Sequence, residues 1–420
     1  MYIDLPYDNP ESVTMGDYAV ATYIVSDVAQ DDAFKKAGAF AVGQTVGTWI
    51  KLPGVTQQMV EQWQARVVGL YMVTPDLQPE RPKYVMRIAF PMHNFAGCFA
   101  MMMTALVGND VSTALPLRLV DIELGQRALS HFKGPRQSVQ GIRRLAGVYE
   151  RPLILNMIKP CIGYTLEDGT KLFYESGISG VDLIKDDEVM GDVEYTTVKD
   201  RVRAYLAAGR RIKEEIGKEP VYFVNITASP KRMHENARAV IDLGAKAVMI
   251  NFVAAGADVL HEISEEYGDK LCILGHYAGC DIMNSAKRGV SDSVALGVIP
   301  RLAGADAVMV MSPHLPGHLE YVRTLQKHQL PLGEIRPVFS AIGGGITPMN
   351  LGRIIREAGR DTILGIGGAM QGHPMGMAAG LKAVMAALDA ALSDRPLAEA
   401  ADACAELRTA IDVWGMPETS

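Results

Sequence analysis

The chain has 420 residues, of which 48% are hydrophobic and 21% are charged, and its net charge is −7 at pH 7. This composition is typical of a globular protein of two or more domains, and the negative charge argues against nucleic acid or an anionic membrane surface as a partner. Five scattered cysteines form no CxxC pair or zinc spacing. With no secretion signal and no apolar run of about 20 residues, we expect a cytoplasmic protein.

The first third of the chain is predicted to be an α+β domain. Its predicted strands are residues 18–26, 65–73, 84–90 and 117–122, and its predicted helices are residues 31–47, 57–65 and 94–106. The order β-α-β-β-α-β is the ferredoxin-like arrangement. Gly134-Pro135 and a basic helix at residues 136–145 then act as a bridge. We therefore expect an N-terminal ferredoxin-like domain over residues 1–135.

From residue 153 onward, short apolar strands alternate with amphipathic helices. The predicted strands are residues 153–158, 181–185, 221–226, 247–252, 272–276, 307–311, 338–342 and 362–366. Their separation of roughly 25 to 40 residues is the spacing of βα units, and eight units in about 250 residues make one barrel. Residues 136–420 are therefore predicted to be a (β/α)8 TIM barrel with C-terminal helices after residue 395.

Side chains able to do chemistry follow several of these strands, and in such barrels the strand ends meet at one mouth. Lys159 follows the first strand and His276 ends the fifth. After the second strand, alternation sends Lys185 and Asp187 to one side and Asp186 to the other. Two carboxylates beside a lysine suit Mg²⁺, which prefers oxygen ligands. The alternative is a solvated charge cluster in a loop.

Two glycine clusters lie at the same predicted mouth, at residues 343–345 and 365–368. Glycines after strands seven and eight let backbone N–H groups converge on a phosphate. A lone glycine cluster is more often a turn, and a lone histidine is more often structural. The joint occurrence of these features on one face predicts an active site.

These motifs resemble those of the RuBisCO superfamily, and more closely the RuBisCO-like proteins (form IV) than the carboxylases. The most specific piece is the sequence GVDLIKDDE at residues 180–188. The other matching pieces are Thr45-Val46-Gly47-Thr48-Trp49, Phe132-Lys133-Gly134-Pro135, Arg151-Pro152-Leu153, Lys159-Pro160, Gly275-His276, residues 365–368, Gly372-His373-Pro374 and Trp414-Gly415.

The resemblance implies a set of site residues. Lys185 would be carbamylated by CO₂, and that carbamate would hold Mg²⁺ together with Asp187 and Glu188. A phosphate would be bound by Thr48, Trp49, Gly345, Gly367 and Gly368. The resemblance also implies a homodimer with shared active sites, in which Thr48, Trp49 and Asn109 of one subunit complete the site of its partner.

Departures from the carboxylase pattern narrow the expected activity. The loop lysine after strand six is replaced by His318, a glutamate of the N-terminal domain by Gly43, and the second lysine of Lys-Pro-Lys by Cys161. An arginine, a histidine and a serine of the second phosphate site are replaced by Tyr277, Met311 and Gly343. We therefore expect neither a bisphosphate substrate nor CO₂ fixation, and we expect a small sugar-like monophosphate.

The nearest branch is the enolase acting on diketo methylthiopentyl phosphate in methionine salvage, although that branch has its proton-abstracting lysine where Asn109 stands. We expect a Mg²⁺-dependent isomerase or enolase of a sugar-like monophosphate such as a methylthio-pentulose phosphate. The alternatives are a decarboxylase of a 3-oxo sugar-acid phosphate through the same enolate and a catalytically silent sugar-phosphate binder. Lys159 is the first candidate for the base or proton relay. The Lys185 carbamate, His276 and His318 are its rivals.

Overall fold

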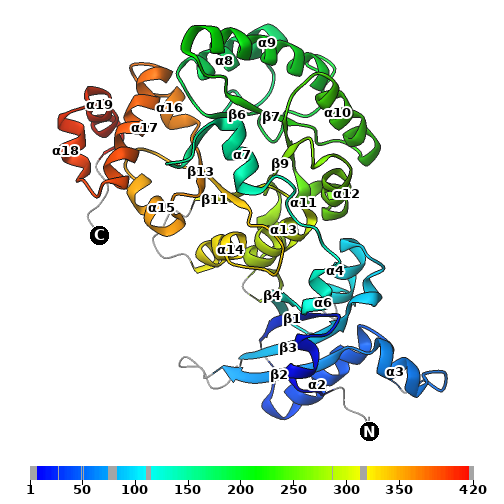
Figure 1. Cartoon of the computed structure of the whole chain (residues 1–420). Helices are drawn as coiled ribbons and strands as arrows, with labels where there is room; N and C mark the ends of the chain where they lie inside the picture. The colour runs from blue at the N-terminus through cyan, green and yellow to red at the C-terminus, as the bar shows by residue number, and fades with distance from the viewer. Residues whose placement is uncertain are drawn as a thin grey trace.

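The computed structural model describes residues 7–26, 28–48, 50, 52–73, 83–109, 115–285, 287–312 and 319–415. Figure 1 shows a smaller α+β domain at the N-terminal end of the chain and a larger barrel that carries the C-terminal helices on one side. Across these ranges, the structure contains no helix with the length and apolar character needed to cross a membrane. The predicted domain boundary after residue 135 stays a prediction.

The N-terminal domain is built on a five-stranded sheet of order β10-β4-β1-β3-β2. Four of its strands are β1 (Tyr18–Val25), β2 (Arg66–Val73), β3 (Lys83–Pro91) and β4 (Leu117–Leu124). Their neighbouring pairs are antiparallel. The helices of this domain are α1 (Pro10–Thr14), α2 (Gln30–Gly43), α3 (Gln57–Trp63), α4 (Phe99–Val107) and α6 (Gln126–Leu129). The predicted ferredoxin-like arrangement is confirmed.

The helix predicted over residues 94–106 is wrong in its first part, because the chain breaks there. A 3-10 turn, η1 (Met92–Phe95), is followed by Ala96 and Gly97 with φ of 50° and 71°, and α4 begins only at Phe99. Asp258 of the barrel accepts hydrogen bonds from the backbone N–H groups of Phe99 and Ala100, at 2.7 and 2.8 Å. This distant carboxylate satisfies the first free donors of α4 and fixes where the helix starts.

The fifth strand of the sheet, β10 (Gly289–Val290), comes from the barrel half of the chain and pairs in parallel with β4. Arg118 of β4 donates two hydrogen bonds to Asn284 Oδ1, at 3.1 and 2.9 Å, just before this strand. Such a two-residue strand has no sequence pattern of its own, because its partner lies far away in the chain.

All eight predicted barrel strands are present and close on themselves in the order β11-β12-β13-β5-β6-β7-β8-β9. They are β5 (Leu153–Met157), β6 (Leu183–Lys185), β7 (Val221–Asn225), β8 (Ala247–Ile250), β9 (Cys272–Gly275), β11 (Ala307–Met311), β12 (Phe339–Gly343) and β13 (Thr362–Gly365). The TIM barrel is confirmed. The second strand begins two residues later than predicted.

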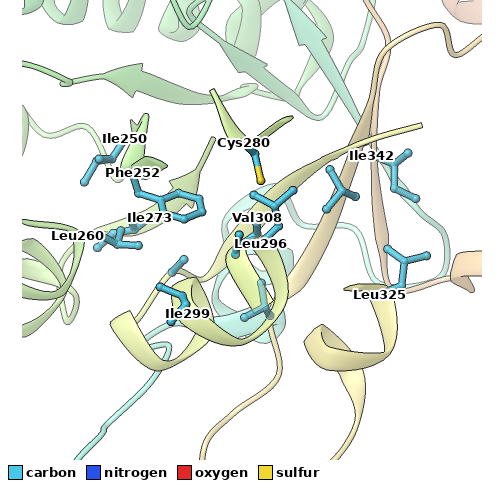
Figure 2. Close-up of a cluster of buried hydrophobic side chains, with 14 of the residues drawn as sticks. Ile250, Phe252, Leu260, Ile273, Cys280, Leu296, Ile299, Val308, Leu325 and Ile342 are labelled. Carbon is cyan, nitrogen blue, oxygen red and sulfur yellow. The ribbon is translucent and has the colours of Figure 1, made fainter. Parts of the chain in front are cut away.

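Helices surround the barrel, and the longer ones bury its outer face. They are α8 (Leu166–Ile178), α9 (Val198–Ile216), α10 (Pro230–Asp242), α11 (Phe252–Ala255), α12 (Ala257–Tyr267), η2 (Cys280–Met283), η3 (Ser293–Val298), α13 (Ile299–Ala303), α14 (Leu319–Gln329), α15 (Leu351–Ala358) and α16 (Gly368–Gln371). Figure 2 shows part of this layer, with Ile273, Val308 and Ile342 from the strands and Leu296, Ile299 and Leu325 from the helical segments in one cluster of buried side chains. The C-terminal helices are α17 (Met377–Leu392), α18 (Leu397–Asp402) and α19 (Ala405–Trp414).

The basic helix predicted as a bridge, α7 (Ser138–Ala146), also belongs to the barrel core. Val139, Ile142 and Ala146 pack with the inward-facing strand residues, such as Leu153 and Phe223. Leu153 is the first residue of β5, and the Arg143 guanidinium of α7 lies 5.0 Å from the ring centroid of Phe339, the first residue of β12. Because these residues begin their strands, α7 closes the end of the barrel opposite to the strand ends. The strand ends are thereby left as the open mouth.

Candidate active site

Lys185 is the last residue of β6 and is buried inside the barrel. Its amine donates a hydrogen bond to the Asp186 carbonyl at 2.9 Å and lies 3.5 Å from Glu188 Oε2. Burial lowers the pKa of Lys185 below that of free lysine, against the opposing effect of Glu188 and Asp187. Because CO₂ reacts with the neutral amine, this environment fits the carbamate implied for Lys185.

Asp186 points the other way, to the outside of the barrel, as the strand alternation predicts. Its carboxylate accepts hydrogen bonds from the Tyr222 hydroxyl at 2.7 Å and the Asn225 N–H at 2.9 Å. Arg201 of α9 forms a buried ion pair with the same carboxylate, with 3.3 Å between Arg201 Nε and Asp186 Oδ2. Arg201 also donates to the carbonyls of Gly191 and Thr196, at 2.9 and 2.6 Å. The loop that carries Asp187 and Glu188 is therefore held from behind.

Two asparagines at neighbouring strand ends hold the same loop from the front. Asn225 donates to the carbonyls of Asp187 and Glu188, both at 3.1 Å, and Asn251 donates to the Glu188 carbonyl at 2.8 Å. The sequence places both asparagines at strand ends but does not assign them this function. Their amides bind the backbone carbonyls of Asp187 and Glu188 rather than the two carboxylates.

Lys159 lies beside Asp187, with 2.7 Å between its amine and Asp187 Oδ2 and 3.0 Å to Cys161 Sγ. Partial burial opposes its charge, but these two contacts outweigh burial and raise the pKa of Lys159 above its usual range. Burial likewise would raise the pKa of Asp187, but the hydrogen bond from Lys159 and the nearby Lys185 hold it below its usual range. Lys159 is thus the counter-ion of Asp187.

His276 at the end of β9 faces Glu188, with 3.5 Å between Nε2 and Oε2. Its Nδ1 accepts a hydrogen bond from the Ala278 N–H at 3.2 Å, so the proton of the neutral ring is on Nε2. Burial, together with the charges of Lys185 and Lys159, lowers the pKa of His276 to about 3. The ring is thus a neutral donor that points at the carboxylate.

One cavity of about 360 Å³ at the barrel mouth brings Lys159, Glu188 and His276 together with the two glycine clusters. Its lining residues are Met157, Lys159, Glu188, His276, Tyr277, Met309, Gly344, Gly345, Ile346, Thr347, Gly365, Gly367, Gly368, Ala369 and Trp414. A Cβ added at Gly368 would meet no atom within 4 Å, so this glycine borders open space. Gly345 has φ of 65°, where a side chain is strained. Gly345, Gly367 and Gly368 form a small, concave surface of backbone that can receive an anion, called the glycine cradle below.

Part of the cavity wall is apolar. Tyr277 stacks on His276, with ring centroids 4.7 Å apart, and its hydroxyl lies 3.8 Å from Met311 Sδ. Met309 lies nearby in the cavity wall. Lys159 and His276 are the basic residues among the described lining. This wall suits an uncharged tail and supplies no cation for a second phosphate.

Some predicted site residues lie elsewhere. Thr48 and Asn109 belong to the N-terminal domain and are not among the residues that line this cavity. Trp49 and His318 lie outside the described residues. Conversely, Trp414, named in the sequence only as part of a C-terminal motif, lines the cavity. Its place depends on how α19 packs, which no local pattern encodes.

The described part of the chain holds no cluster of three or more His, Cys, Asp or Glu side chains arranged for a metal. Asp187 and Glu188 supply two carboxylates, and the Lys185 amine at the end of β6 lies 3.5 Å from Glu188 Oε2. A carbamate on Lys185 would add the third oxygen ligand, and such an all-oxygen set suits Mg²⁺. The residues therefore fit the metal once Lys185 is modified.

Comparison with known proteins agrees with this architecture from end to end. The family model for the ribulose bisphosphate carboxylase large chain, catalytic domain, matches residues 138–414, and the model for its N-terminal domain matches residues 2–127. A ribulose bisphosphate carboxylase-like protein of Archaeoglobus fulgidus is 34% identical over 93% of this chain and 92% of its own. A 2,3-diketo-5-methylthiopentyl-1-phosphate enolase of Geobacillus thermodenitrificans is 35% identical over 95% of this chain and 98% of its own.

Solved structures give the same result. The rubisco-like protein MtnW of Alicyclobacillus acidocaldarius superimposes with a TM-score of 0.85 at 34% identity, covering 95% of this chain and 100% of that one. The octameric RuBisCO of Pyrococcus horikoshii has a TM-score of 0.88 at 30% identity, covering 99% and 96%. The chain therefore belongs to the RuBisCO large-chain family, among its RuBisCO-like, form IV, members.

Proposed function

We propose that this protein is a Mg²⁺-dependent, non-carboxylating enolase of methionine salvage, acting on 2,3-diketo-5-methylthiopentyl 1-phosphate or a similar keto monophosphate. The observation that carries this proposal is the single cavity in which Lys159, Glu188 and His276 face one glycine cradle and an apolar wall. A substrate with one phosphate and an uncharged thioether tail matches those three surfaces. Curated relatives that carry this enolase name align over almost the whole chain.

The metal site would consist of Asp187, Glu188 and a carbamate formed by CO₂ on Lys185. Mg²⁺ held there would supply positive charge that stabilises the negative charge of an enolate as it develops. Asn225, Asn251 and the Asp186 network would keep the two carboxylates in place.

The remaining steps belong to side chains and backbone of the chain itself. The N–H groups near Gly345, Gly367 and Gly368 would bind the phosphate and orient the substrate across the mouth. Lys159 would remove or relay the α-proton once its contact with Asp187 is broken, because a general base must reach the proton within hydrogen-bond distance. His276 would donate from Nε2 to a developing oxygen, since its ring is neutral.

The site would be completed in a homodimer. Thr48, Trp49 and Asn109 belong to the N-terminal domain, and the family resemblance assigns them to the site of the partner subunit. Solved relatives include a dimeric RuBisCO from Hyperthermus butylicus and the octamer named above. A dimer would bring the phosphate contacts of Thr48 and Trp49 to the glycine cradle of the other subunit.

A second candidate function is favoured by one residue. Asn109 stands where the enolase branch has its proton-abstracting lysine, and a decarboxylase needs no such base. Loss of CO₂ from a 3-oxo sugar-acid phosphate would leave the same enolate, which Lys159 could then protonate. The carboxylates, cradle and apolar wall would serve this reaction equally.

Solvent exchange separates the two functions. The enzyme, with Mg²⁺ and bicarbonate in D₂O, is given 2,3-diketo-5-methylthiopentyl 1-phosphate, methylthioribulose 1-phosphate and a 3-oxo sugar-acid phosphate. Incorporation of deuterium into either of the first two substrates by the wild type, but not by Asp187→Asn, supports the enolase or isomerase. CO₂ release from the third with no exchange in the others supports the decarboxylase. Inertness toward all three, with binding intact, leaves a silent binder.

A further inference from the structure

The C-terminal helix brings an aromatic side chain into the catalytic cavity. Trp414 is the last residue of α19 and lines the cavity together with Gly367 and Gly368. Its side chain remains 37% exposed. Figure 1 shows α19 beside α17, with α16 close by at the edge of the barrel. No other residue after Ala369 is among the described lining of this cavity.

The buried side chain of His373 connects the region after α16 to α19 and contacts Trp414. His373 Nε2 lies 2.9 Å from the Glu406 carbonyl of α19, and its Nδ1 accepts from the Met375 N–H at 3.1 Å. This pairing places the proton on Nε2, which donates to Glu406. The His373 ring also meets Trp414 edge-on, with centroids 6.1 Å apart and planes at 68°. Because α16 begins at Gly368, a single turn connects the glycine cradle to the residue that holds Trp414.

Trp414 offers two properties that the glycines lack. Its indole N–H is a donor, and among the described residues no hydrogen bond takes it up. Its ring is a large apolar surface that excludes water, which strengthens hydrogen bonds to a charged group. The cradle itself contributes only backbone donors and borders open space at Gly368. An anion there would have a wall on the α19 side only through Trp414.

We propose that Trp414 is a substrate-contacting residue that closes the phosphate end of the cavity, donating its indole N–H to the phosphoryl group and covering it with the ring. His373 is the positioning residue that sets the orientation of the indole. This inference rests on the proposed function only in placing the phosphate at Gly345, Gly367 and Gly368. It extends that function by assigning the C-terminal helix a direct part in substrate binding.

Inorganic phosphate is the probe, added to full-length enzyme that contains Mg²⁺ and bicarbonate. Removing one hydrogen bond to a charged group weakens binding by about tenfold to hundredfold. Trp414→Phe, which keeps a ring but loses the N–H, should therefore weaken phosphate binding in calorimetry by about tenfold, and Trp414→Ala by more. Trp63→Phe is the control, because Trp63 lies on α3, outside the cavity lining, with a similar exposure of 39%.

A spectroscopic measurement tests contact directly and needs no turnover. The chain contains three tryptophans, so 5-fluorotryptophan labelling gives three ¹⁹F resonances that Trp63→Phe and Trp414→Phe assign. Phosphate should shift the Trp414 resonance and leave that of Trp63 unchanged. His373→Gln should weaken phosphate binding less than Trp414→Ala and alter the starting position of the Trp414 resonance.

The outcomes separate this inference from the proposed function. If Gly368→Ala abolishes phosphate binding while Trp414→Phe and Trp414→Ala bind normally and the Trp414 resonance stays fixed, the Trp414 contact is overturned and the cradle stands. If the wild type binds no phosphate, or Gly368→Ala binds it normally, the phosphate site is not at these glycines. Both the Trp414 contact and the proposed function, as far as it places the phosphate there, are then wrong.

Discussion

The Lys159 amine lies 2.7 Å from Asp187 Oδ2, so the candidate base and a candidate metal ligand form an ion pair. A single oxygen cannot serve the lysine and a metal ion equally well, because the two cations repel each other. Metal binding and release of Lys159 toward the substrate are therefore coupled in this geometry. The neighbouring contact with Cys161, at 3.0 Å, gives the amine a second partner that would keep it at the cavity with Asp187 bound to a metal ion.

Replacing Lys159 separates its two effects. Lys159→Met should lower kcat by about 10²- to 10⁴-fold, the usual contribution of a general acid or base. The same change should tighten Mg²⁺ binding, because it removes the cation that competes for Asp187. Steady-state exchange rates and calorimetric Mg²⁺ titration check the two effects. Lys171→Met on the outer helix α8 is the control, since its side chain is 76% exposed. Unchanged turnover would exclude Lys159 as base or relay.

The proposed carbamylation of Lys185 can be tested without turnover. With ¹³C-labelled bicarbonate and Mg²⁺, the wild type should show a carbamate carbon resonance, and Lys185→Met should show none. Chelation of the metal should weaken the resonance, because Mg²⁺ and the carbamate stabilise each other through linkage. Lys171→Met serves again as the surface control. A resonance that persists in Lys185→Met would place the carbamate on another lysine and remove the third metal ligand.

The alternating pattern of the second barrel strand was sufficient to separate Lys185 and Asp187 from Asp186, because a strand has a fixed period of two. The eight barrel strands could be predicted because each is a short apolar run and the runs recur at the spacing of βα units, and this order places the residues that follow them at one mouth. The start of α4 could not, because it depends on Asp258, more than 150 residues later in the chain. The position of Trp414 depends in the same way on how α19 packs and on the contact with His373. Local patterns encode strand faces, whereas these features arise from contacts between distant segments.

The buried Arg201–Asp186 pair lies behind the loop that carries Asp187 and Glu188. This pair should matter for both the free energy of unfolding and the affinity for Mg²⁺. Arg201→Met leaves Asp186 as an unpaired buried charge and frees the carbonyls of Gly191 and Thr196, which should cost about 3–5 kcal/mol. Mg²⁺ affinity should fall as well, because the loop loses its anchor. Arg203→Met on the same helix is the control, with a 62% exposed side chain and an expected change below about 0.5 kcal/mol. Urea unfolding and Mg²⁺ titration test this, with Arg201→Lys as the conservative variant. Equal effects of the two methionine variants would contradict the anchoring role.

A methyl group at Gly368 probes the phosphate cradle by steric exclusion. The backbone there does not require glycine, and the added Cβ would meet no protein atom within 4 Å. Gly368→Ala should therefore fold normally but raise KM for the phosphorylated substrate by about tenfold or more, because the methyl group occupies space next to the N–H donors. Gly54→Ala is the matched control, since its Cβ also meets nothing. Kinetics for the two variants, together with their melting temperatures, decide the matter. An unchanged KM would move the phosphate away from Gly368.

Acid sensitivity of the fold should depend on His328, which is buried on α14. Its Nδ1 lies 3.0 Å from Ser340 Oγ and its Nε2 lies 2.8 Å from the Leu296 carbonyl. Burial lowers the pKa of His328 to about 4, although the Leu296 carbonyl acts against this shift. Between about pH 6.5 and pH 4 the unfolded chain therefore binds a proton that the folded chain does not, and the free energy of unfolding falls as the pH falls. The loss from this residue reaches about 3 kcal/mol near pH 4.

His328→Gln removes this titration while it keeps a polar group at the same place. The variant is expected to be less stable than the wild type above pH 7, because its hydrogen bonds are less well placed, but to lose less stability on acidification. The comparison is between slopes, measured by urea unfolding at pH steps from 8 to 4.5. His276, whose pKa is lowered to about 3, keeps its own contribution in both proteins. His93→Gln, at an exposed position on η1, should leave the slope unchanged. Parallel slopes in wild type and His328→Gln would show that His328 takes up its proton at the same pH in the folded and unfolded chain.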